Sequence, residues 1–112
     1  MGPWSSEEIN QARRVPFYTV LKFLGAHHKR DRDYAPVDSN RQSVRVHVGY
    51  NGRDFRFIFT NEKWFNELLP VDYPGRGGGG AIDFVRHLTG CGFVQAVKVC
   101  IDAHAHTDGD AK

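Results

Sequence analysis

The chain has 112 residues, a formal net charge of +2 and a hydrophobic content of 40%, which suit a single globular domain with one modest core. No apolar run is long enough to span a membrane, and the polar N-terminus is unlike a secretory signal, so a cytoplasmic location is expected. Residues 1–60 hold ten Lys and Arg against six Asp and Glu, and residues 61–112 hold five against seven. This balance is too weak to establish a polyanionic partner by itself.

The first part of the chain predicts helices. Serines at 5–6 can cap a helix whose first turn would hold two glutamates, so the segment 1–14 is expected to be partly helical. Apolar residues at i, i+3, i+4 and i+7 from Phe17, followed by Gly25, predict a second helix over 16–24.

The middle of the chain predicts a small antiparallel sheet. Residues 26–41 lack an apolar period and are expected to form a loop. Apolar and polar residues then alternate over 43–50 and again over 54–60, and the intervening Asn51-Gly52 pair is a strong hairpin signal. A short third strand is predicted at 63–65, with Trp64 at its centre.

The last part predicts a loop followed by two helices. Residues 66–76 contain two prolines and should form the loop, and four consecutive glycines follow Arg76. Helical apolar spacing then begins at Ala81 and again at Phe93, with Gly90 between the two helices. Both cysteines, Cys91 and Cys100, are interpreted as buried thiols without a disulfide.

These elements predict an α+β fold in which a three-stranded antiparallel sheet packs against an N-terminal helix and two C-terminal helices. The expected organisation is an N-terminal segment over 1–14, one domain over 15–105 and a disordered tail over 106–112.

The glycine run Gly77, Gly78, Gly79 and Gly80 has two interpretations that the sequence leaves open. Successive backbone N–H groups leading into a helix can bind a phosphate, with Arg76 adding a charge-assisted contact. The alternative is a turn that needs glycine because a helix packs close to the end of a strand. Asp83, in the first turn of the next helix, is interpreted as complementing the helix dipole.

One face of the predicted hairpin combines cations with aromatic rings, as proteins that hold single-stranded nucleic acid do. The alternative is an ordinary solvated face whose rings belong partly to the core. The candidate nucleic-acid-binding residues are Arg45, His47, Tyr50, Arg53, Arg56, Trp64 and Arg76. In the polar loop, Lys29, Arg30, Arg32 and Arg41 could extend this surface.

Two motifs resemble the zinc-binding domain of bacterial DNA primases of the DnaG type. The run Gly78-Gly79-Gly80-Ala81-Ile82-Asp83-Phe84 corresponds to a G-G-D-A-I-D-F run of that family. Gly90-Cys91-Gly92-Phe93-Val94-Gln95-Ala96-Val97 corresponds to its G-x-S-F-x-E-A-V run. The resemblance extends over residues 15–103, and it is topological alone at the hairpin.

The zinc ligands of that family are missing. Its C-x-x-H pair falls on Tyr34 and Val37, and its C-x-x-C pair falls on Asp72 and Gly75, of which only Asp72 is even a weak ligand. The resemblance therefore implies a zinc-ribbon-like domain that has lost its metal. The vacated place is expected to be filled by side chains of the segment 64–73, namely Trp64, Phe65, Leu68, Leu69 and Tyr73.

Other metal sites are not expected, because no two of the remaining histidines and cysteines have a reliable ligand spacing. They are His27, His28, Cys91, Cys100, His104 and His106. No catalytic constellation is found either, so neither a cofactor nor an enzymatic activity is predicted.

The resemblance implies a non-catalytic module that binds nucleic acid, single-stranded DNA first of all, in replication or conjugative transfer of a plasmid or other mobile element. The alternative is a protein-interaction module that docks a primase, helicase or relaxase through the aromatic segment 64–73. A metal-dependent nuclease is a weaker third hypothesis.

Overall fold

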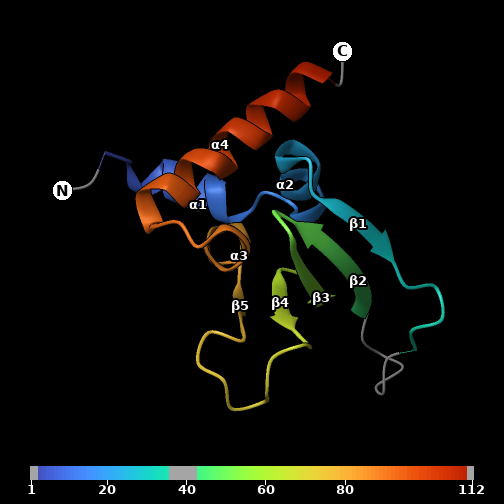
Figure 1. Cartoon of the computed structure of the whole chain (residues 1–112). Coiled ribbons are helices and arrows are strands. Elements are labelled where there is room, and N and C mark those ends of the chain that lie inside the picture. The colour runs from blue at the N-terminus through green and yellow to red at the C-terminus, as the bar shows by residue number, and fades with distance from the viewer. Residues whose placement is uncertain (1–2, 36–42, 111–112) are drawn as a thin grey trace.

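A computed structural model describes residues 3–35 and 43–110, with the side chains of 107–110 excluded. Val37 and Arg41 lie outside these ranges. The elements are α1 (Ser6–Arg13), α2 (Phe17–Leu24), β1 (His27–Arg30), β2 (Ser43–Tyr50), β3 (Arg53–Thr60), β4 (Lys63–Asn66), β5 (Gly77–Gly79), α3 (Ala81–Thr89) and α4 (Phe93–Asp110) (Figure 1). No helix within the described ranges is both long and apolar enough to cross a membrane.

The strands form one antiparallel sheet in the order β1-β2-β3-β4-β5, so each strand pairs with its neighbour in sequence. The hairpin between β2 and β3 turns at Asn51 and Gly52, whose φ angles are 51° and 77°, as the sequence predicted. The α+β class is confirmed, but the prediction of three strands is wrong, because within the described residues the sheet has five.

The two additional strands lie at the edges of the sheet. β1 comes from the predicted loop 26–41, and three of its four residues are exposed, so it shows no apolar alternation. β5 consists of glycines alone, which carry no β-strand pattern. In both cases pairing with a neighbouring strand, rather than local preference, produces the strand.

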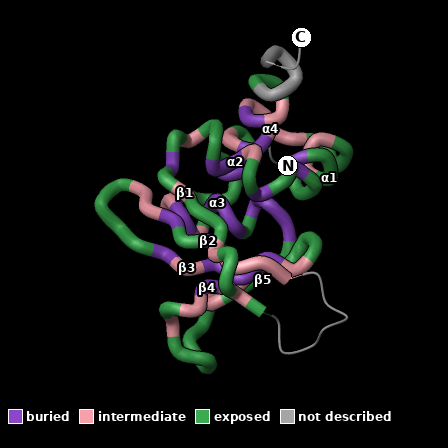
Figure 2. Tube along the Cα trace, turned by 90° about the vertical axis from the view of Figure 1, so that its right-hand side faces the viewer, coloured by how far each residue is buried: buried purple, intermediate pink, exposed green. Residues whose placement is uncertain are grey.

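The helices cover one face of the sheet, and the core lies between the two layers (Figures 1 and 2). Three phenylalanines of β3 alternate toward the helices, and Phe57 packs edge-on against Phe84 of α3 with ring centroids 4.9 Å apart. Phe17 of α2 lies 4.6 Å from Phe59. The largest fully buried side chains are Phe57, Phe84, Leu21, Leu88, Val20, Val46, Val85, Val97 and Cys100.

The helix ends follow the sequence signals. Ser5 and Glu8 form a capping box at the start of α1, in which each side chain accepts a hydrogen bond from the other residue's backbone N–H. Gly25 and Gly90 end α2 and α3 in the left-handed conformation, as expected. α4 continues to Asp110, into the stretch for which a tail was predicted.

The segment expected to fill the place of the lost metal is only partly core. Trp64 is 4% exposed and packs among Phe57, Phe84 and His87. In contrast, Leu68 and Tyr73 are 50% and 52% exposed, so their predicted burial is wrong. Both belong to the loop between β4 and β5, which extends away from the helical layer (Figure 1). Phe65 and Leu69 are half-buried.

Candidate nucleic-acid interface

Three of the candidate residues, Arg45, His47 and Arg56, lie on the sheet face opposite the helices, which we call the outer face. The strand register aligns Lys29, His47 and Arg56 in one row across β1, β2 and β3. Arg45 lies in the next row, opposite Ile58. Alternation along the strands thus brings the predicted residues Arg45, His47 and Arg56 together on one surface, as the sequence indicated.

Acidic side chains neutralise part of this face. Glu67, just after β4, accepts hydrogen bonds from Nε of Arg45 at 2.7 Å and from Nε of Arg56 at 3.1 Å. Asp31, just after β1, lies 3.4 Å from Nη1 of Arg45 and 3.5 Å from Nε2 of His47. The two arginines are therefore ordered by ion pairs rather than solvated individually.

These contacts also change the protonation equilibria. The pKa of Arg45 is raised, chiefly by its hydrogen bonds to Glu67. The pKa of Asp31 is lowered, chiefly by the hydrogen bond that it accepts from the backbone N–H of Asp33, with Arg45 and His47 adding to the effect. The ion pair between Asp31 and Arg45 therefore stays charged through the neutral range.

The two predicted stacking rings are not on the outer face. Trp64 is buried in the core, and Tyr50 is half-buried against the same core. The rings near the arginines serve as platforms for them instead: the guanidinium of Arg45 lies 4.6 Å from the Tyr34 ring centroid, and that of Arg76 lies 4.5 Å from the Phe65 ring centroid. Arg53, at the hairpin end, lies 5.1 Å from the ring of Phe55.

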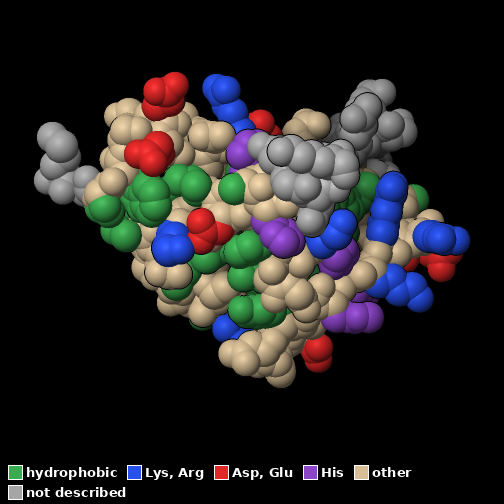
Figure 3. All heavy atoms as spheres, turned by 90° about the horizontal axis from the view of Figure 1, so that it is seen from above, with side chains coloured by type: hydrophobic (Ala, Val, Ile, Leu, Met, Phe, Trp, Pro, Cys, Tyr) green, Lys and Arg blue, Asp and Glu red, His purple; other side chains and the backbone are tan. Residues whose placement is uncertain are grey.

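Three neighbouring cations at the β1 edge are not neutralised by a described acidic group. Lys29, Arg30 and Arg32 are exposed, and no ion pair joins them to any other described residue. Figure 3 shows Lys, Arg and His side chains gathered on the side of the molecule where β1 lies. A shallow hollow of about 300 Å³ opens beside Lys29, His47 and Arg56, and it also includes His27 and the apolar side chain of Leu68.

The glycine run forms β5 and the start of α3 instead of a separate anion-binding turn. Gly77, Gly78 and Gly79 pair with β4, and the backbone N–H of Gly80 donates to the carbonyl oxygen of Glu62 at 2.7 Å. A side chain at Gly77 would begin 2.7 Å from the carbonyl oxygen of Trp64, too close for any Cβ. The geometry favours the second interpretation, close packing. Arg76 is held by the carbonyl oxygen of Leu69 at 3.1 Å.

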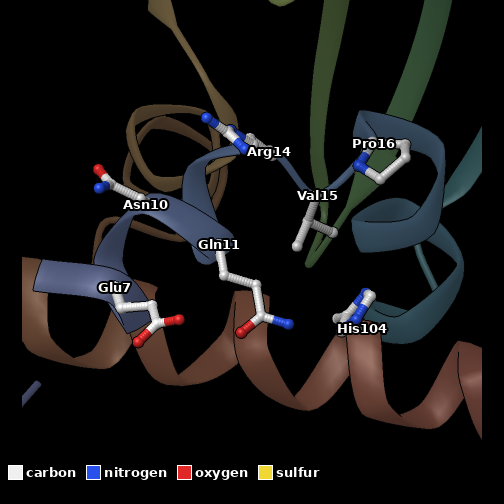
Figure 4. A pocket seen from close by; sticks show the side chains of 7 residues that line it. All are labelled: Glu7, Asn10, Gln11, Arg14, Val15, Pro16 and His104. Atoms are coloured by element: carbon white, nitrogen blue, oxygen red, sulfur yellow. The ribbon is translucent and has the colours of Figure 1, made fainter. Parts of the chain in front are cut away.

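A hollow of about 730 Å³ lies between α1 and α4 and was not predicted (Figure 4). Gln11 of α1 and His104 of α4 point toward the space between the helices, whereas Asn10 points away from it. Glu7, Arg14, Val15 and Pro16 complete the lining. No local motif indicates such a hollow, because it arises when α1 docks on α4, where Trp4 Nε1 donates to the carbonyl oxygen of Val94.

The predicted metal-ligand positions do not form a metal site. Tyr34, Asp72 and Gly75 lie in loops, and in the described parts of the chain no three His, Cys, Asp or Glu side chains are arranged to hold a metal ion. Comparison with protein-family models, with the sequences of curated proteins and with solved structures gives no match to this chain. The resemblance to the primase zinc-binding domain therefore stays a hypothesis.

Proposed function

We propose that the protein is a non-catalytic nucleic-acid-binding module that prefers single-stranded DNA, as expected of a component of mobile-element replication or transfer. The binding surface is the β1 edge together with the adjoining row of the outer face. The observation that carries this proposal is the alignment of Lys29, His47 and Arg56 across three strands, continued at the edge by Arg30 and Arg32.

This arrangement suits a phosphate backbone. Neighbouring strands lie about 5 Å apart, so long basic side chains in a row across three strands can contact more than one phosphate of an extended backbone. Arg56 uses Nε for its hydrogen bond to Glu67, so its terminal nitrogens are not needed for that bond and can contact a phosphate. The hollow beside the row gives room for a sugar or base next to Leu68.

The test measures binding of fluorescently labelled oligothymidine by anisotropy over a salt series. Three phosphate contacts predict a slope of log K against log salt of about −2 for single-stranded DNA. The combined variant Lys29→Ala, Arg30→Ala, Arg32→Ala should lose about tenfold or more in affinity at low salt and show a shallower slope.

Lys98→Ala provides a control at a cation outside the proposed surface. Lys98 is an exposed cation of α4, paired with Asp102 at 2.7 Å and distant from the sheet face, so its removal should leave the affinity nearly unchanged. The triple variant removes three positive charges and Lys98→Ala removes one, so an equal loss of affinity per removed charge would mean that only net charge matters. The absence of binding at low salt would refute the proposal, and tighter binding of a duplex of the same length would refute the preference for single strands.

A second candidate function is docking of a partner protein, such as a primase, helicase or relaxase. The observation that favours it is the exposure of apolar residues in the β4–β5 loop, where Val71 is 85% and Tyr73 52% exposed. Binding of a purified partner should then be insensitive to salt and lost in the variant Val71→Asp, while the Lys29, Arg30, Arg32 variant binds normally.

A further inference from the structure

The two outer edges of the sheet differ in their side chains. β1 presents Lys29 and Arg30, and charged residues of this kind discourage the pairing of another strand. β5 presents only glycines, so it has no side chain that protects its edge. Among the described strands, only β4 pairs with β5, and the opposite edge of β5 is unpaired.

The hydrogen-bond pattern identifies the unpaired backbone groups. The carbonyl oxygen of Arg76 accepts from the N–H of Asn66 at 2.8 Å, and the N–H of Gly80 donates to Glu62 at 2.7 Å, so these residues face β4. Backbone groups alternate in direction along a strand. The N–H and C=O groups of Gly77 and Gly79 therefore point away from β4, toward the open edge.

A groove runs between this edge and α3. It has a volume of about 360 Å³ and is lined by Gly75 and Gly77 on the strand side and by Asp83 and Arg86 on the helix side. Trp64 also lines it, and its indole Nε1 is buried without a hydrogen-bond partner among the described residues. Because this nitrogen is buried, a ligand in the groove would contact the ring of Trp64 rather than its N–H.

We propose that this groove binds an extended peptide segment of a partner protein, which adds to the sheet as a strand beside β5. The backbone of the segment pairs with Gly77 and Gly79 at the open edge of β5. The positive φ angles of Gly75 and Gly80, 79° and 84°, turn the chain at both ends of β5, which limits the added strand to about three or four residues.

Charge indicates the composition of this segment. Arg86 is exposed and has no ion pair within the described residues, so it would pair with an acidic side chain or a terminal carboxylate of the peptide. Asp83 lies one turn earlier on α3 and would repel a second acidic side chain of the peptide placed next to it. The recognised segment is thus short, extended and singly acidic.

The test uses Gly79 because a substitution there can remove a single donor. A side chain at Gly79 would meet nothing within 4 Å, and its φ is not in the left-handed region. Gly79→Pro deletes the outward N–H at an edge position where proline is tolerated, and Gly79→Ala is the matched control that keeps the N–H. Peptides are selected from a random linear library against the wild-type protein, synthesised and titrated by fluorescence anisotropy.

The selected peptides should share an acidic residue and bind Gly79→Pro about tenfold more weakly than the wild type, while Gly79→Ala stays within about twofold. Arg86→Gln should weaken binding about fivefold in a salt-dependent way. Equal affinity for Gly79→Pro and Gly79→Ala, with both variants folded by circular dichroism, would overturn the proposal. So would a library without binders, or a wild-type dimer that Gly79→Pro dissociates, because a second copy would then occupy the edge. Nucleic-acid binding uses the opposite edge, so either proposal can fail without the other.

Discussion

Glu67 determines how much positive charge the outer face offers to a ligand. It is 19% exposed in its side chain and accepts hydrogen bonds from both Arg45 and Arg56. Glu67→Gln keeps an acceptor but removes the negative charge, so the variant should bind oligothymidine about two- to fivefold more tightly at low salt. It should also unfold at a temperature a few degrees lower, because two arginines lose their charged partner. Anisotropy and thermal melting measure the two effects.

Glu62→Gln is the control for this change in net charge. Glu62 is exposed, and no ion pair joins it to another described residue. Equal affinity gains in the Glu62 and Glu67 variants would show that the ion-pair network does not limit binding. An unchanged affinity in Glu67→Gln would place the nucleic-acid surface elsewhere.

Close packing, and not a positive φ angle, requires glycine at position 77. Its missing Cβ would lie 2.7 Å from the carbonyl oxygen of Trp64 and 2.8 Å from Cβ of Phe65. Gly77→Ala should therefore lower the free energy of unfolding by about 1–3 kcal/mol, since β5 must separate from β4. Gly79→Ala, two residues away in open space, should change it by no more than about 0.5 kcal/mol. Urea denaturation of both variants decides the matter, and equal stabilities would contradict the packing argument.

At the scale of elements, His87 connects α3 to the end of β4. Its Nε2 lies 3.2 Å from Nδ2 of Asn66, which donates to it, and the imidazole also interacts with the backbone of Gly75. Burial lowers the pKa of His87 below its ordinary value of 6.5, and the charge of Arg53 lowers it further. The neutral imidazole is therefore the form that the folded chain favours.

This shift predicts that acidification destabilises the protein. The unfolded chain binds the proton more readily, so the stabilising contribution is complete above the unfolded pKa and is lost as the pH falls from about 6.5 toward the lower folded value. The variant His87→Gln should show a smaller decrease in the free energy of unfolding over that window. Urea titrations at several pH values compare the two proteins, and identical pH dependences would exclude His87 as the group responsible.

The sequence predicted those elements whose signals are local. Asn51 and Gly52 specify the hairpin turn by their tolerance of positive φ, and Gly25 and Gly90 specify helix ends in the same way. β1 and β5 could not be predicted locally, because their pairing with β2 and β4 defines them. Trp64 was deducible in principle: it pairs with Phe59, so it must share the core face of that residue.

The sequence predicted the candidate site less completely, because residues that meet in it are far apart along the chain. Alternation correctly grouped Arg45, His47 and Arg56, but Glu67 is 22 residues from Arg45 and reaches it only because β3 and β4 pair. The groove at β5 and the hollow between α1 and α4 likewise depend on the docking of segments that are remote in sequence. The residue types along a strand indicate which side chains a face contains. Tertiary contacts determine which of the charges on that face remain available to bind a ligand.

At the scale of the whole molecule, Cys100 reports whether the core unfolds as one unit. It is fully buried in α4, a helix that packs on α1, α2 and α3, and burial raises the pKa of its thiol to about 12. Cys91, between α3 and α4, is only half-buried and borders the β5 groove. Because the thiolate is the reactive form, the two cysteines should differ strongly in reactivity toward an aromatic disulfide reagent.

We expect Cys100, isolated in the variant Cys91→Ser, to react at least about a hundredfold more slowly than Cys91 isolated in Cys100→Ala. If one cooperative core includes all the helices, the Cys100 rate should rise with urea in parallel with global unfolding measured by circular dichroism. A rate that rises at lower urea, before the sheet melts, would mean that α4 detaches separately. In that case the hollow between α1 and α4 would open without disturbing either edge of the sheet.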